Sequence, residues 1–187
     1  VLVTHTHPDH FSGLGGVVDK GAATPIYVPK DFMAYAAAEG VLGGNHTSRR
    51  AIDQFGLALP MGADGLVDSG IGKTVARGFR GFREPTHEID ETDTSRVIDG
   101  VTFEFMMGSG TEAPAEFMFF LPAHGVLCMA EVCTQTQHNI LTPRGAEVRD
   151  ARLWAKVIDE ALVRFGDRSN ILINCHFIIE PLLAYFK

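Results

Sequence analysis

The first ten residues hold the densest group of side chains able to do chemistry. Residues 4–10, THTHPDH, place three imidazoles and one carboxylate directly after an apolar run. Alternate side chains of an extended backbone share a face, so we expect His5, His7 and Asp9 to converge. His10 is expected to join them where the chain turns. Nitrogen and oxygen donors in this combination suit zinc or another borderline divalent ion.

The spacing of these donors is more specific than a single pair of histidines. Histidines in a polar turn often only meet solvent, but here all four donors follow an apolar segment in register. The pattern His-x-His-x-Asp-His resembles the motif of the metallo-β-lactamase superfamily. In that superfamily the motif follows several strands and a helix, so the resemblance implies that this chain is a partial domain.

Length and composition indicate an ordinary globular chain. It has 187 residues, of which 45% are hydrophobic and 21% are charged, within the size range of one domain. The formal net charge of −7 disfavours a nucleic-acid partner, which requires a basic face. No apolar run reaches the roughly 18 residues that a transmembrane helix needs.

Two further patterns argue against other kinds of site. The three cysteines, Cys128, Cys133 and Cys175, lack CxxC spacing, so a disulfide framework is not expected. Cys128 and Cys175 lie in apolar runs and are expected to be small core residues. The segment GIGKT at residues 70–74 resembles the end of a phosphate-binding loop, but Val67 stands where that loop needs glycine. Nucleotide binding is therefore not predicted.

The elements expected to position the donors mix without a regular βαβ rhythm. Helices are predicted over 11–20, 31–41, 47–55 and 146–165, and strands over 26–28, 101–105, 116–121, 126–130 and 171–173. This order favours a layered α/β sandwich over a doubly wound sheet.

Two metal ions need more donors than the first motif supplies. His176 and Glu131 each follow a predicted strand, where sites are often assembled, and the segment 111–116 adds two carboxylates, Glu112 and Glu116. Each of these has a plainer alternative as a hydrogen-bonded or solvated side chain. Four other histidines compete for the same role: His46, His87, His124 and His138.

Several longer segments resemble the alkylsulfatases of the SDS-hydrolysing type. They are TEAPAE at 111–116, AE at 130–131, HNILT at 138–142 and RGAEVRD at 144–150. The similarity runs from His5 to His176. It implies a four-layer αββα sandwich of the metallo-β-lactamase kind that lacks its N-terminal strands. It also implies that the family's helical dimerisation domain and sterol-carrier-like domain are absent from this chain.

The resemblance further implies a site with two Zn²⁺ ions. One zinc would be held by His5, His7 and Glu112, the other by Asp9, His10 and His176, with Glu131 as the bridge. Glu112 matches the family's ligand better than Glu116. Asn139 and Arg144 match positions around the sulfate group, and Asp9, Glu131 and Arg144 are the residues implied in catalysis.

The activity implied is hydrolysis of alkyl sulfate esters, such as dodecyl sulfate, to alcohol and sulfate by a metal-bridged hydroxide. Two alternatives stay open: another hydrolase of this fold, acting on a β-lactam, thioester or phosphodiester, and an inactive metal-binding fragment.

The family's residues after His176 differ from FIIEP at 177–181. The resemblance also implies a periplasmic or secreted location, homodimers of the full-length protein, and lower activity for this 187-residue chain than for a longer one.

Overall fold

Two sheets form the centre of the molecule. The computed structural model describes residues 1–70, 72, 81–134, 138–176 and 180–181. The smaller sheet pairs β1 (Tyr27–Pro29) in parallel with β2 (His87–Ile89). The larger sheet has the order β3 to β8, with the strands Ser95–Ile98, Val101–Met107, Phe117–Leu121, Val126–Cys128, Ile171–Ile173 and Glu180–Pro181.

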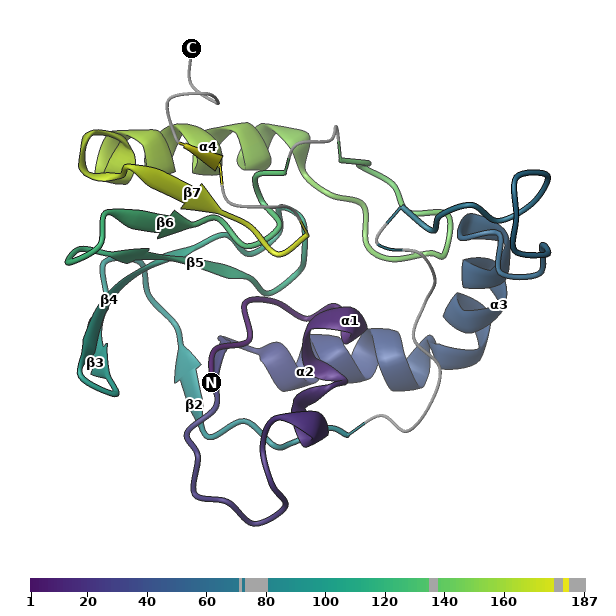
Figure 1. The fold of residues 1–187 in the computed structure, drawn as a ribbon, viewed down its shortest axis with the longest axis horizontal. Helices are drawn as coiled ribbons and strands as arrows, with labels where there is room; N and C mark the ends of the chain where they lie inside the picture. The colour runs from purple at the N-terminus through teal and green to yellow at the C-terminus, as the bar shows by residue number, and fades with distance from the viewer. Residues whose placement is uncertain (71, 73–80, 135–137, 177–179, 182–187) are drawn as a thin grey trace.

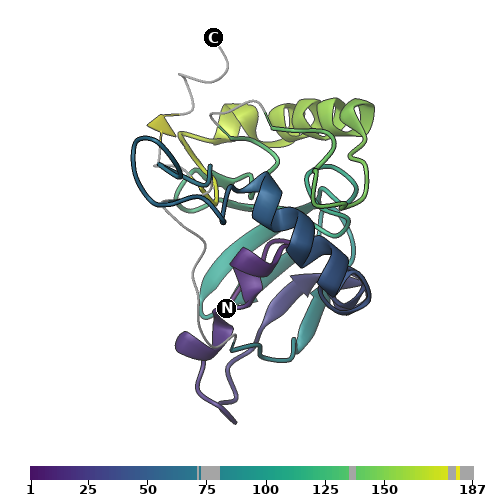
Figure 2. The same cartoon turned by 90° about the vertical axis from the view of Figure 1, so that its right-hand side faces the viewer.

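Helices cover the outer sides of the two sheets (Figure 1). The long helix α4 (Ala151–Phe165) lies along one outer side, and the view turned by 90° shows it there again (Figure 2). On the opposite side lie α1 (Pro8–Phe11) and α2 (Phe32–Ala37). The latter continues as the π-helix η2 (Ala38–Leu42) into α3 (Gly44–Gln54).

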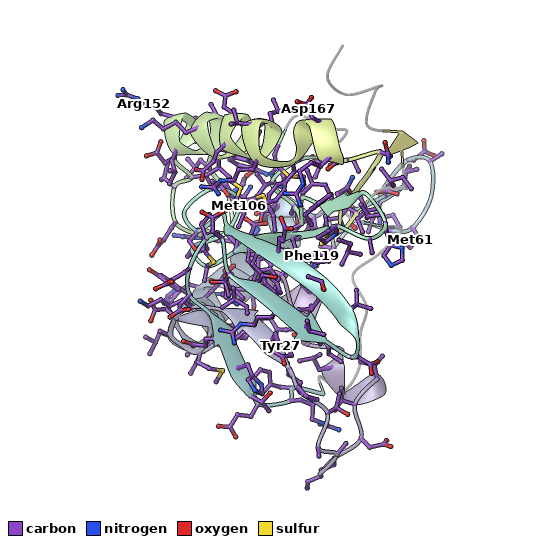
Figure 3. The ribbon with its side chains drawn as sticks, turned by 90° about the vertical axis from the view of Figure 1, so that its left-hand side faces the viewer. Tyr27, Met61, Met106, Phe119, Arg152 and Asp167 are labelled. Carbon is purple, nitrogen blue, oxygen red and sulfur yellow. The ribbon has the colours of Figure 1, made fainter. Side chains whose placement is uncertain are left out.

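Three buried hydrophobic clusters separate these layers. Trp154 and Phe165 of α4 pack against the large sheet, in a cluster that includes Met106. Phe105 and its neighbours on the other face of the same strands pack with the small sheet, and Val28 packs with Phe32 of α2. Figure 3 shows Met106 close beneath α4 and Phe119 nearer to Tyr27. The predicted layered α/β sandwich is confirmed.

The helix boundaries differ from the prediction where capping decides them. The helix predicted over 146–165 begins at Ala151, because the Asp150 carboxylate accepts hydrogen bonds from the backbone N–H groups of Arg152 and Leu153, both at 2.9 Å. The helix predicted over 11–20 is wrong. Only α1 and a 3₁₀ turn, η1 (Leu14–Gly16), form there, since the glycines disfavour a longer helix. The helix η3 (Gly166–Arg168) extends α4.

Several strand predictions also need correction. The strand predicted over 126–130 ends at Cys128, because Ala130 adopts a left-handed φ of 49°. β7 is not the last strand, since β8 pairs with it, and the short strands β2 and β3 carry too little pattern to be predicted. Cys175 is exposed, contrary to the expected core position, whereas Cys128 is buried.

Some predictions cannot be compared with the structure. In the segment GIGKT, Ile71, Lys73 and Thr74 lie outside the described residues.

No helix among the described residues is long and apolar enough to cross a membrane.

Replacing the α4 cap tests how this helix begins. We expect Asp150→Ala to lower the free energy of unfolding by about 1 kcal/mol, because two N–H groups lose their acceptor. Urea denaturation measures this change. Asp159→Ala, inside the same helix and exposed, is the matched control and is not expected to lower the free energy of unfolding, because alanine has a higher helix propensity than aspartate. Equal effects of both changes would contradict the capping role.

Candidate metal centre

The N-terminal segment enters the molecule as an extended chain between the two sheets. The Val3 N–H donates to Tyr27 O at 2.9 Å, and the Phe117 N–H donates to Thr4 O at 2.9 Å. This pairing with β1 on one side and β5 on the other buries His5 completely. His7 follows on the same extended backbone and is the last residue before α1.

The extended pattern predicted that Asp9 shares a face with His5 and His7, and this prediction is wrong. Pro8 begins α1, because its fixed φ suits the first turn of a helix. Asp9 and His10 therefore lie on a helical turn and point toward a different partner. That partner is His176, whose Nε2 lies 3.1 Å from His10 Nε2.

Glu131 and His176 come from neighbouring parallel strands. β6 and β7 run in parallel, so their carboxyl ends meet at one edge of the sheet. Each residue lies three positions beyond its strand, and the Cys175 N–H donates to Ala130 O at 3.0 Å, which joins the two extensions. Figure 1 shows α1 facing this edge.

One group of possible ligands is buried: His5, His7, Glu112 and Glu131. Their ligand atoms all lie within 4.8 Å of one another. Glu112 Oε2 is 3.0 Å from His7 Nδ1 and 3.6 Å from His5 Nε2. The loop between β4 and β5 supplies Glu112.

A second group lies beside the first: Asp9, His10 and His176. Asp9 Oδ2 is 3.1 Å from His10 Nε2 and 3.6 Å from His176 Nε2. Glu131 Oε2 reaches both groups, at 3.2 Å from His5 Nε2 and 3.0 Å from His176 Nε2. The structure thus brings all seven residues of the implied ligand set close together, and two of its groups match the expected groupings. A third group joins His5 and His10 with Cys175.

The donor set fits a metal ion. Two buried atoms, His5 Nε2 and Glu112 Oε2, have no hydrogen-bond partner within the described part of the chain. Burying such atoms is costly unless they are satisfied in another way, and both point into the first group. A neutral imidazole and ionised carboxylates are the forms that bind metal.

The electrostatics keep the carboxylates ionised and His5 neutral. Burial lowers the pKa of His5 to about 4, so its imidazole is neutral at neutral pH. Burial alone raises the pKa of Glu131, but close contacts with four histidines outweigh it and hold the pKa well below its usual value. Burial raises the pKa of Glu112, but the neighbouring imidazoles of His7 and His5 together outweigh it, so the pKa is lowered.

Burial lowers the pKa of His10, but hydrogen bonds with Asp9, Cys175 and Glu131 outweigh it and raise that pKa to about 12.

Glu116, the second carboxylate of its segment, does not join either group. It is fully buried, and it accepts hydrogen bonds from the backbone N–H groups of Ala113 and Glu131, each at 3.2 Å. Burial, followed by the charge of Glu112, raises the pKa of Glu116 well above its usual value. The preference for Glu112 over Glu116 as a member of the donor groups agrees with this placement.

Sequence reasoning missed Arg149 and left His138 as one of four competing histidines. Arg149 is buried, and its Nη2 donates to Glu112 Oε1. Its Nη1 donates to His138 Nδ1 at 2.7 Å and to Asn139 Oδ1 at 3.0 Å. The signal was the RGAEVRD run, in which an arginine directly precedes a helix cap.

This contact decides the tautomer of His138. A guanidinium only donates hydrogen bonds, so His138 Nδ1 accepts and its proton is on Nε2. That Nε2 lies 2.9 Å from Glu131 Oε1. His138 therefore presents an N–H group to the site, and its Nε2 lone pair is not free for a metal.

The other competing histidines lie elsewhere. His46 Nδ1 accepts from Arg49 on α3 at 3.0 Å, and His87 stacks on Tyr27 with ring centroids 4.6 Å apart. His124 is in the exposed turn after β5.

The two groups open into a pocket of about 590 Å³. Asn139 and Arg144, predicted near the sulfate group, both line it. Arg144 is held in place by Glu39, whose Oε1 accepts from its Nε at 2.9 Å, and by Gln54, whose Oε1 accepts from its backbone N–H at 2.8 Å. Ala51, Phe55, Leu57 and Pro143 give the pocket an apolar part.

Comparison with known proteins identifies similar chains. The sequence is 42% identical over 180 residues to the alkyl/aryl-sulfatase BDS1 of Saccharomyces cerevisiae, which covers 94% of this chain and 28% of that protein. It is 41% identical over 180 residues to a linear primary-alkylsulfatase of a Pseudomonas species, which covers 94% of this chain and 27% of that protein. The chain thus spans less than a third of these relatives.

The structure is similar to that of the stereoselective inverting sec-alkylsulfatase Pisa1 from Pseudomonas. The TM-score is 0.89 at 38% sequence identity, and the alignment covers 97% of this chain and 29% of that one. Residues 1–176 match the family described as the metallo-beta-lactamase superfamily. Because this match includes nearly all of the described sheets and the histidine-rich edge between them, the chain belongs to the metallo-β-lactamase superfamily.

Proposed function

We propose that this chain is part of the catalytic domain of a zinc-dependent alkylsulfatase, which hydrolyses alkyl sulfate esters to alcohol and sulfate. The observation that carries the proposal is the pair of donor groups joined by Glu131, at the floor of a pocket that also holds Arg144. The three similar proteins described above are all named as sulfatases, which supports the substrate class. Further domains and dimers remain proposals that rest on resemblance.

Two Zn²⁺ ions would occupy the two groups. His5, His7 and Glu112 would hold one, Asp9, His10 and His176 the other, and Glu131 would contact both. When bound, the ions lower the pKa of a shared water and so supply a nucleophile at neutral pH. Glu112 and Glu131 add negative charge to the ligand set and thereby temper its Lewis acidity.

The chain's own residues would bind and orient the anionic head group. The guanidinium of Arg144 offers a planar fork of donors that matches sulfate oxygens. Asn139 lines the same pocket, and its amide nitrogen is a possible second donor. These donors would stabilise the charge that the sulfate gains as it leaves.

The apolar part of the pocket suits an alkyl chain. Ala51, Phe55 and Leu57 lie on and after α3 and line the pocket. Burial of each methylene contributes about 0.8 kcal/mol, so a long chain is held better than a short one.

Sulfate release from dodecyl sulfate tests the substrate class. We expect the zinc-loaded protein to release sulfate and dodecanol in equal amounts, and the chelated protein to release neither. Zinc content is measured in the same samples. Nitrocefin and a phosphodiester serve as comparison substrates. A protein that binds zinc, leaves dodecyl sulfate intact and turns over either comparison substrate would contradict the proposed substrate.

Removing the shared carboxylate tests the arrangement of the metals. We expect Glu131→Gln to weaken binding of both zinc ions by roughly 100-fold or more, because a neutral amide replaces the carboxylate that reaches both groups. Competition with a chromophoric chelator measures the affinity. Glu104→Gln, which changes a carboxylate paired with Arg168 far from the site, is the matched control. Loss of only one ion would argue against a bridge.

The arginine on the pocket wall is tested by its effect on kinetics. A charge-assisted hydrogen bond contributes about 1.5–3 kcal/mol, so we expect Arg144→Ala to lower kcat/KM by roughly 10- to 100-fold. Arg144→Lys keeps the positive charge but loses the planar pair of donors, so its kcat/KM should lie between those of the wild type and Arg144→Ala. Arg96→Ala, on exposed β3, controls for loss of positive charge. Unchanged kinetics in Arg144→Ala would remove this residue from the binding site.

A further inference from the structure

Glu116 is a buried carboxylate that neither donor group contains. It immediately precedes β5 and is fully inaccessible to solvent. Its two oxygens accept hydrogen bonds from two different segments. Oε2 accepts from the Ala113 N–H at 3.2 Å, and Oε1 accepts from the Glu131 N–H at 3.2 Å.

These two N–H groups flank the carboxylates proposed as ligands. Ala113 is the residue after Glu112, so the bond to Oε2 fixes the loop that carries Glu112. The bond to Oε1 reaches the backbone of Glu131 itself, 15 residues away in sequence. One side chain thus sets the spacing between the loop after β4 and the extension of β6.

The backbone at Glu116 fixes a third segment. Glu116 forms an antiparallel bridge with His5, and the adjacent Phe117 N–H donates to Thr4 O at 2.9 Å. The Gly108 N–H donates to Glu116 O at 2.9 Å and closes the loop that contains Glu112. Glu116 therefore contacts all three segments that supply the buried donor group.

From this geometry we propose that Glu116 is a positioning residue, whose two carboxyl oxygens hold Glu112 and Glu131 at the separation that metal binding requires. The inference rests on the proposed metal centre but not on the substrate. It explains why the TEAPAE segment has two glutamates. The first faces the donor group, and the second holds the backbone around it.

Substitution by glutamine separates this role from simple burial. Glutamine has the same shape, but its amide keeps one acceptor and turns an N–H₂ group toward a backbone N–H. This loss follows whether the carboxyl is ionised or protonated, since both forms keep two acceptor oxygens. Glu116→Met removes both acceptors and keeps the apolar volume.

We expect Glu116→Gln to weaken zinc binding by about 10- to 100-fold, the usual effect of losing a residue that orients metal ligands, and Glu116→Met to weaken it further. Chelator competition measures the affinity without reference to any substrate. Val157→Ala, in the cluster beneath α4, controls for lost stability, and Glu104→Gln controls for lost charge. Both controls should keep the wild-type affinity. Wild-type zinc affinity in folded Glu116→Gln and Glu116→Met would overturn the proposal.

Amide hydrogen exchange gives a test that needs no variant and no metal. In the metal-free wild-type protein, the Ala113 and Glu131 N–H groups should be protected, because Glu116 accepts from both. NMR measures their exchange rates. Exchange of either amide at the rate of an unstructured peptide would overturn the proposal, even if the Glu116 variants do not fold. A protein that binds zinc yet spares dodecyl sulfate would refute the substrate and leave this role standing.

Discussion

The arrangement of the site depends on one carboxylate that several imidazoles share. Glu131 lies within 3.3 Å of ring nitrogens on four histidines, which come from three segments far apart in the sequence. Such a group is stable in a buried place only when its charge is matched by nearby donors or by cations. The parallel pairing of β6 with β7, the left-handed turn at Ala130 and the short helix α1 all serve to bring those donors to it.

The same constraint explains the layer of residues behind the donors. Three glutamates, Glu112, Glu116 and Glu131, are buried within a short distance of one another. Arg149 partly balances this charge through Glu112, and it also orients His138 by donating to its Nδ1. Because Asp150 caps α4 and Trp154 donates to Val132 O at 2.7 Å, the long helix holds these residues against the sheet. The contacts that hold α4 against the sheet therefore also hold the residues around the donor groups in place.

The predictions that succeeded rest on patterns local in sequence. The spacing of His5, His7, Asp9 and His10 predicted that these donors lie close together, and the structure places them in neighbouring groups of possible metal ligands. The expectation that Asp9 shares a face with His5 failed, because Pro8 starts a helix one residue earlier. Arg149 was missed because its place directly before a helix cap does not by itself show that the side chain is buried against Glu112.

The sequence by itself determined the donor types, the apolar strands and the long amphipathic helix, and so the superfamily. These features follow from side-chain chemistry and from periodicity, which need no knowledge of distant contacts. Only the tertiary structure decided which donors meet, because Glu112, Glu131 and His176 are brought to His5 by strand pairing across more than 100 residues. It also decided the tautomer of His138 and the buried place of Glu116, since hydrogen bonds between distant segments set both.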